Sequence, residues 1–215
     1  MAAKKIKLKI NRRVFEREVA KGRSSKVFKD LAYKKAEERA EEAKEELLKE
    51  FEESKITQEL QAGSGNMKNI SRNLLGLPYG KGSLFGFIGF NDGDDPVSEV
   101  RSYLKATGHL YKTSRFQKKG KTGGTYEFNV ETPDINAIES LTPMPWEGGR
   151  SWVRGIERGI SGLGYYIANH SPLSRSGQGI QSKNVYNQAA MYKPSKYMSQ
   201  MISNFIRVIQ GRKPR

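Results

Sequence analysis

Residues 25–54 form the longest stretch that a single secondary-structure element can explain. They contain no glycine or proline, and their apolar residues recur every three or four positions, which predicts one long helix with a narrow apolar stripe. Thirty residues at ~1.5 Å each give a rod of roughly 45 Å. The spacing is not a sustained heptad, so we expect this helix to lie across a sheet and not in a coiled coil. The stripe consists of Phe28, Ala32, Ala36, Ala40, Ala43, Leu47 and Phe51.

Charge is distributed along the chain in three blocks of different sign. Residues 1–35 carry a net +10, residues 36–59 a net −6 and residues 60–215 a net +11, which gives +15 for the whole chain. A solvated helix face between two basic ends is one interpretation of this pattern. The alternative is a subunit that meets several surfaces of different sign, with the basic arm of a second subunit lying along the acidic block.

Composition excludes several classes of protein. The 215 residues include no cysteine, which excludes disulfides, a thiol nucleophile and a zinc–thiolate site, and two histidines leave little material for a metal site. The apolar runs are far shorter than the ~20 residues that cross a bilayer. The first six residues show no signal-peptide core. We therefore expect a basic, soluble protein with no cofactor and no membrane partner.

Two regions alternate with the period of two that is typical of strands. Around Ile6, Leu8 and Ile10 the intervening residues are lysines, a pattern that suits a sheet edge or an arm that adds to a neighbour's sheet. Residues 110–116 and 125–130 predict a β-hairpin, and the glycine- and lysine-rich segment between them predicts its tip.

Short helices and loops are expected through the rest of the chain. Residues 57–83 predict an extended loop, and residues 83–90, the most hydrophobic stretch, predict a buried strand. Asp95 and Pro96 predict the N-cap and first position of a short helix. We further expect helices at 134–141 and 151–167, an extended arm at 171–193, and a terminal helix from Pro194 to Gly211.

No pattern in the sequence indicates catalytic chemistry. The acidic turn at 91–95 resembles a calcium loop only superficially, because an EF-hand needs flanking helices and a glutamate at its twelfth position. The segment around Ser161 lacks a nucleophile elbow, and neither His109 nor His170 is placed to serve it as a base. We predict that the protein is not an enzyme. Sequence-independent nucleic-acid binding is the alternative function, because the basic residues of the hairpin tip and tail can neutralise phosphates.

Three segments resemble the neck or tail-completion proteins of tailed bacteriophages. The first is LFGFIGF at 84–90 followed by DGDDP at 92–96. The second runs from GRSW at 149–152 to GIERGISGL at 155–163, and the third is SRSG at 174–177 leading to IQ at 180–181. The resemblance covers roughly residues 57–210, and its motifs consist of packing and turn residues without catalytic groups.

The resemblance implies an α+β fold in which a long N-terminal helix packs on a small, mostly antiparallel sheet, with extended N- and C-terminal arms and a C-terminal helix. It implies a homo-oligomeric ring, six- or twelve-fold, at the head–tail junction of the virion. Its neighbours would be other neck, connector, tail-tube or sheath proteins, and double-stranded DNA would pass through it non-specifically. The ring would be assembled in the host cytoplasm and would remain in the virion neck.

The expected organisation has three segments. They are a basic N-terminal arm or strand (1–23), an α+β core domain (24–167), and an extended basic arm with a C-terminal helix (168–215). We predict no catalytic and no metal-binding residue. The predicted subunit-interface residues are Ile6, Leu8, Ile10, Lys118, Lys119, Lys121, Arg175, Gln181 and Tyr186. The residues expected to face DNA are Lys183, Lys193, Lys196, Arg212, Lys213 and Arg215.

Overall fold

The fold mixes helices with small antiparallel sheets, as the sequence predicts. The computed structural model describes residues 4–11, 25–63, 84–119, 123–145, 147–158, 166–168, 180–182 and 195–214. The chain divides into two units. Unit 1 comprises Met1–Leu48, Leu104–Asp134 and Ile202–Arg215, and unit 2 comprises Lys49–Tyr103 and Ile135–Met201.

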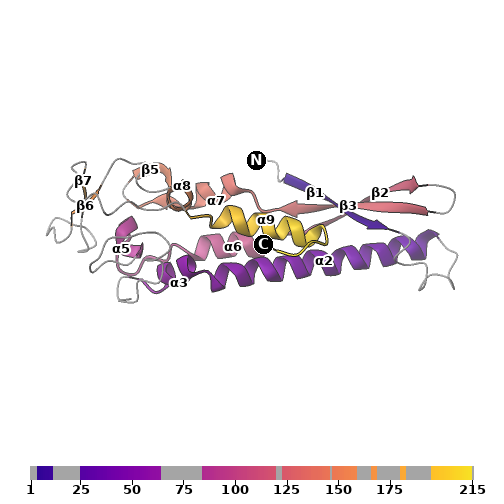
Figure 1. Ribbon diagram of the computed structural model, residues 1–215, viewed down its shortest axis with the longest axis horizontal. Coiled ribbons are helices and arrows are strands. Elements are labelled where there is room, and N and C mark those ends of the chain that lie inside the picture. Colours follow the sequence, from indigo (N-terminus) through magenta and orange to yellow (C-terminus); the bar gives the residue numbers. More distant parts are fainter. Residues whose placement is uncertain are drawn as a thin grey trace. The chain divides into compact units, whose positions relative to one another are not determined.

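Unit 1 contains a three-stranded antiparallel sheet with the strand order β1–β3–β2 (Figure 1). β1 spans Lys4–Asn11, β2 spans Leu110–Lys119 and β3 spans Gly123–Thr132. The predicted hairpin is therefore confirmed, with strands longer than expected. The strand β3 lies between the other two strands, and its Tyr126 and Phe128 are buried.

The long helix α2 (Ser25–Glu53) lies against this sheet in unit 1. The ring of Tyr33 meets the ring of Phe128 edge-on, with centroids 5.9 Å apart. Alanines on the contacting stripe allow a neighbouring backbone to approach closely, since they bury little volume. The predicted stripe is confirmed where side chains are described, because Ala32, Ala36, Ala40, Ala43, Leu47 and Phe51 are all buried.

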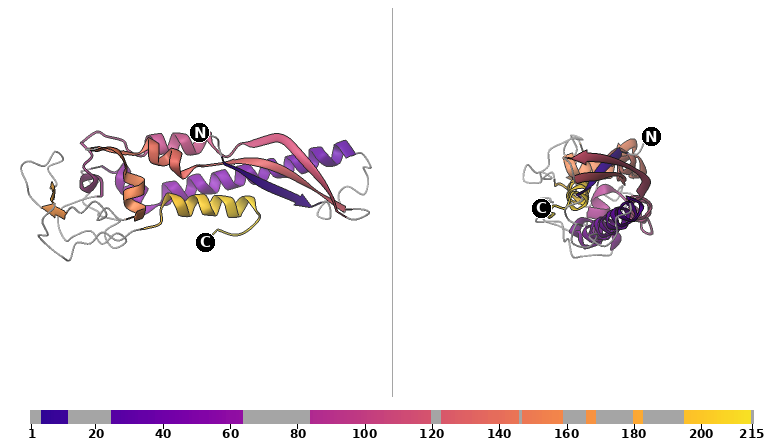
Figure 2. Two further views of the ribbon diagram at one scale, coloured as in Figure 1. Left: turned by 90° about the horizontal axis from the view of Figure 1, so that it is seen from above. Right: turned by 90° about the vertical axis from the view of Figure 1, so that its right-hand side faces the viewer.

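The C-terminal helix α9 spans Met198–Ile209, and its unit 1 residues lie beside α2 (Figure 2). A glycine, Gly211, ends the helix with φ +74°, a conformation that other residues rarely adopt. The N–H of Gly211 donates to the carbonyl of Val208, and the N–H of Arg212 donates to that of Arg207. This is a Schellman motif, so the predicted helix end at Gly211 is confirmed.

Unit 2 is built from short helices around a buried cluster of aromatic rings. The helices are α3 (Lys55–Gln61), α5 (Leu84–Ile88), α6 (Ser98–Ala106), α7 (Ile135–Leu141) and α8 (Trp152–Arg158), with α6 continuing into unit 1 after Tyr103. Two small antiparallel sheets pair β4 (Pro143–Met144) with β5 (Glu147–Ser151), and β6 (Tyr166–Ala168) with β7 (Ile180–Ser182).

Three sequence predictions in unit 2 are wrong. The apolar run at 84–88 is the helix α5 and not a strand, because a short run of apolar residues suits a buried helix as well as a buried strand. Residues 57–61, the start of the predicted loop at 57–83, belong to the helix α3. The helix predicted for 151–167 begins at Trp152 but is described only to Arg158, and residues 166–168 form a strand. The glycines between these two elements disfavour a continuous helix.

Candidate functional site

The predicted interface strand β1 pairs with β3 along its whole length. Ile6 stands opposite Val130, Leu8 opposite Phe128 and Ile10 opposite Tyr126. The structure thus places the strand at the edge of its own sheet, one of the two arrangements that its lysine-rich pattern predicts. Its contact with a neighbouring subunit stays a prediction.

The other predicted interface residues are dispersed. Lys118 and Lys119 end β2, opposite Gly124 and Gly123 of β3, and Gln181 lies in β7 opposite Ile167. The remaining three, Lys121, Arg175 and Tyr186, lie outside the described residues.

The residues predicted to face DNA are described only in part. Lys196 is exposed just before α9 in unit 2, while Arg212 and Lys213 are exposed just after it in unit 1. The Arg207 side chain donates to the carbonyl of Lys213 at 2.8 Å, which folds this segment back onto the end of α9. The other three, Lys183, Lys193 and Arg215, lie outside the described residues.

The acidic block identified in the sequence lies on the solvent-facing side of α2 in unit 1. Its glutamates fall into two rows with i, i+4 spacing: Glu37, Glu41 and Glu45 form one row, and Glu38, Glu42 and Glu46 form the other. Five of these six side chains are exposed, and Glu46 is half-buried.

These rows bring like charges together. Glu38 has a partner in Lys35, whose ammonium lies 2.7 Å from its carboxylate, and this hydrogen bond lowers the pKa of Glu38. Among the residues that the structure describes, Glu41, Glu42 and Glu45 have no ion-pair partner. Like charges at i, i+4 destabilise a helix by a few tenths of a kcal/mol per pair. The face is therefore suited to a cationic partner.

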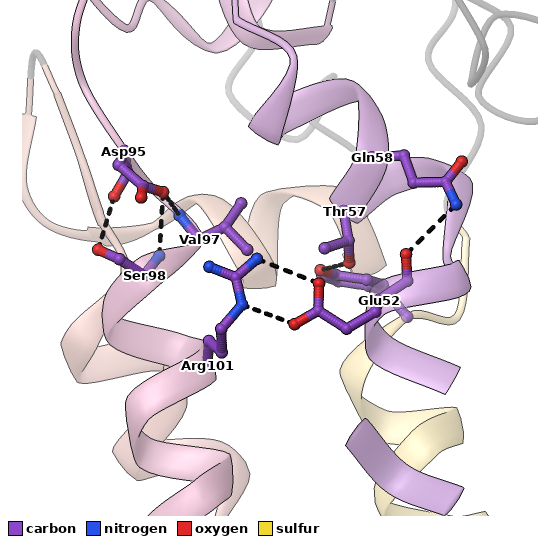
Figure 3. Close-up of polar contacts among 8 residues, drawn as sticks. Glu52, Thr57, Gln58, Asp95, Val97, Ser98 and Arg101 are labelled. Carbon is purple, nitrogen blue, oxygen red and sulfur yellow. Dashed lines mark hydrogen bonds and ion pairs between the residues drawn. The ribbon is translucent and has the colours of Figure 1, made fainter. Parts of the chain in front are cut away.

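Within unit 2, a charged pair fixes α6 to the end of α2 (Figure 3). The Arg101 guanidinium donates from Nε to Glu52 Oε1 at 2.6 Å and from Nη2 to Oε2 at 3.1 Å. This two-point contact raises the pKa of Arg101. The α6 N-terminus is capped as predicted, because Asp95 Oδ1 accepts hydrogen bonds from the N–H groups of Val97 and Ser98.

Two further polar contacts of unit 2 are buried. The carboxylate of Glu59 accepts a 2.6 Å hydrogen bond from the backbone N–H of Leu84, which holds the first residue of α5. The hydroxyls of Thr57 and Tyr197 lie 2.6 Å apart. Burial raises the pKa of Tyr197, since ionisation would place a charge in an apolar interior. Both contacts join residues far apart in the sequence.

The carboxylate of Glu157 caps the C-terminal helix. Glu157 Oε1 accepts hydrogen bonds from the N–H of Ser199 at 2.6 Å and from that of Tyr197 at 3.3 Å, at the start of α9. The N–H of Ser195 donates to the carbonyl of Ile156 next to it. A negative charge at a helix N-terminus is favourable, so α8 sets where α9 begins.

Aromatic rings fill the space between these contacts. The ring of Trp152 meets that of Phe90 edge-on at 6.3 Å and that of Tyr197 at 6.5 Å. Tyr197 also stacks on Phe51 at 6.4 Å, and Phe90 packs on Phe85. All five rings are buried, so this cluster is the core of unit 2.

Sequence reasoning missed the buried polar residues Thr57, Glu59 and Tyr197. Glu59 belongs to the acidic block, whose other glutamates are exposed or half-buried, so composition gives no sign of its burial. The one available signal was local: Glu59 follows Ile56 by three residues, which places both on one side of a short helix.

Other kinds of site find no support in the described part of the chain. Its histidines, aspartates and glutamates nowhere gather in a group of three that is able to hold a metal ion. None of its helices has the length and apolar character needed to cross a membrane.

Comparison with known proteins identifies no relative. No protein-family model, no curated protein and no solved structure matches the chain.

Proposed function

We propose that this protein is a structural ring subunit of a phage virion neck, where it joins or completes the tail and surrounds the DNA channel. The proposal is carried by one observation: two segments that resemble neck and tail-completion proteins, 50 or more residues apart, meet in the core of unit 2. Phe90 from the first segment contacts Trp152 from the second.

The chemistry of these segments supports a mechanical role. The resembling residues cap helices and fill the core: Asp95 caps α6, Ser151 bonds to Thr142 at 2.7 Å, and Glu157 caps α9. Such residues specify a shape, so the resemblance concerns a scaffold and not a reaction. The exposed surface carries both acidic and basic side chains. Charges of both signs suit contacts between subunits.

Partners of both signs follow from the charge distribution. The acidic face of α2 suits a basic partner, and a second copy of the chain supplies one in residues 1–35. A heterologous contact that closes on itself produces a ring, here six- or twelve-fold. Basic residues lining the opening would hold DNA through weak, sequence-independent contacts, as sliding requires.

Native mass spectrometry of the purified chain tests the ring. A single closed oligomer is the expected result, and electron microscopy of particles from the encoding phage should place it between head and tail. Deleting the predicted C-terminal arm and helix (residues 171–215) does not test ring formation. The deletion also removes the buried Tyr197 and Phe205 and would unfold the subunit. A chain that stays monomeric and is absent from purified particles would contradict the proposal.

Sequence-independent nucleic-acid binding is the second candidate. It is favoured by the exposed Lys196, Arg212 and Lys213, in a region that has no carboxylate side chain after Glu157. A salt titration of DNA binding separates the two functions. A steep loss of affinity with salt, shown by a chain that never associates with particles, would favour the second candidate.

A further inference from the structure

The outer strand β1 matches the edge of β3 in a way that specifies one register. Each apolar residue of β1 stands opposite an apolar residue of β3, as in the pairs Ile6–Val130 and Leu8–Phe128. Val130 and Phe128 are fully buried. Residues directly opposite each other belong to the same face of a sheet, so this register aligns the apolar positions of the two strands.

The alternate positions match by charge. Lys5 stands opposite Glu131 and Lys9 opposite Glu127. Glu127 is buried, and Arg115 of β2 stands opposite it on the other side. A shift of one residue would put lysines opposite the buried apolar positions. The edge of β3 is thus a specific acceptor for the sequence KKIKLKIN.

This acceptor does not depend on β1 coming from the same chain. β3 is held independently by its pairing with β2 and by the contact between Phe128 and Tyr33 of α2. The 13 residues between β1 and α2 can span at most roughly 45 Å when extended. A strand on such a tether can reach the sheet of an adjacent copy.

We propose that neighbouring copies exchange this strand: residues 4–11 of one copy pair with β3 of the next, in the register seen here. This inference rests on the ring assembly proposed above, and it identifies the β1–β3 pairing as a contact between its subunits. Because each copy donates one strand and accepts one, the exchange is heterologous and links every neighbour in a closed ring. The contacts made are those observed within one chain, so exchange sacrifices none of them.

Cysteine cross-linking tests the exchange directly, because the chain has no cysteine of its own. Lys7 stands opposite Asn129, which is half-buried. We would co-express the full-length variants Lys7→Cys and Asn129→Cys with different tags and treat the oligomer with a short bismaleimide. Exchange predicts a covalent heterodimer that carries both tags.

The matched control is the pair Lys4→Cys and Thr125→Cys. These positions lie at opposite ends of the same paired strands, separated by seven residues or roughly 23 Å, so a short cross-linker should not join them. If Lys7→Cys lowers expression, Lys5→Cys with Glu131→Cys replaces it, since these residues are also directly opposite.

The double variant, with both cysteines on one chain, completes the test. Exchange predicts a ladder of linked chains from the double variant. If native mass spectrometry shows the oligomer while the double variant links only within single chains, exchange is wrong and the ring stands. If the chain is monomeric and links only within itself, both exchange and the ring are wrong.

Discussion

The helix α2 buries alanines in unit 1, such as Ala32, Ala36 and Ala40, whereas its last turn in unit 2 buries Phe51. The difference extends through both units. Unit 1 joins a helix to a sheet over small side chains and leaves a charged face exposed. Unit 2 gathers aromatic rings around buried hydrogen bonds. A region that is rich in large buried rings depends on each of them, while a region with free strand edges and like charges is suited to further contacts.

Removing the central ring of unit 2 should have the largest effect on stability. Trp152→Ala deletes a buried side chain that contacts both Phe90 and Tyr197, and we expect a loss of about 3–5 kcal/mol in the free energy of unfolding. Urea unfolding followed by circular dichroism measures this loss. The control is Arg154→Ala, on the exposed side of the same helix, and a comparable loss there would contradict the assignment.

Enlarging a buried alanine should be the most damaging simple change in unit 1. Ala36→Leu adds three carbons to a fully buried position of α2, and overpacking of this kind costs about 1–3 kcal/mol. The same unfolding measurement applies, with Lys34→Leu at an exposed position of the helix as the control. An unchanged urea midpoint for Ala36→Leu would contradict the prediction, because it would show that the core of unit 1 can accommodate a larger side chain at this position.

The buried carboxylate of Glu59 in unit 2 should contribute to the free energy of unfolding through its hydrogen bond. Glu59→Ala leaves the N–H of Leu84 without its acceptor, and an unsatisfied buried donor costs about 1–3 kcal/mol. Glu59→Gln keeps an oxygen in that place and should lose less. Thermal unfolding of both variants checks this order, and equal losses would mean that charge and not the hydrogen bond is what matters.

Sequence reasoning succeeds for features that are encoded locally. The α2 stripe, the β2–β3 hairpin, the Asp95 cap and the end of α9 at Gly211 were all predicted, because each is encoded within a few neighbouring residues. The β1–β3 register was also accessible in principle. Ile6, Leu8 and Ile10 match the alternation of Tyr126, Phe128 and Val130, although no local rule pairs strands so distant in the sequence.

The long-range polar contacts of unit 2 could not be predicted from the sequence, for a physical reason. Thr57 and Tyr197 are separated by 140 positions, and Glu52 and Arg101 by 49. Each residue alone resembles many exposed polar residues, and only the fold brings the partners together. The helix α5 was missed because its length is too short for periodicity to separate helix from strand.

The Thr57–Tyr197 contact gives a smaller effect that depends on pH. Tyr197→Phe should cost about 1 kcal/mol at neutral pH, and adding Thr57→Val should recover part of that loss, since no buried hydroxyl is then unpaired. Burial raises the pKa of Tyr197, so its contribution is fully present below the ordinary tyrosine pKa of ~10 and is lost as pH rises above it. Wild type and Tyr197→Phe should therefore converge in melting temperature above pH ~10. A gap that widens in favour of the wild type as pH rises above ~10 would contradict this sign.

Neutralising the acidic face of α2 should have the smallest effect on the isolated subunit. Glu41→Gln with Glu45→Gln removes like-charge repulsion along one row and should raise stability by a few tenths of a kcal/mol. The same double variant should weaken self-association in native mass spectrometry at low salt. Glu53→Gln, exposed and outside both rows, is the control. Lower stability together with unchanged self-association would show that the acidic face of α2 makes no contact between subunits.

The pairing of Thr57 with Tyr197 also bears on the order in which the chain folds. The rings of Phe51 and Trp152 are synthesised long before residue 197, so until then they lack their contact with the ring of Tyr197. Contacts of such long sequence separation slow folding, because a large loop must close before they form. The core of unit 2 is therefore expected to form late in synthesis. Until then the nascent chain exposes apolar side chains, which chaperones bind.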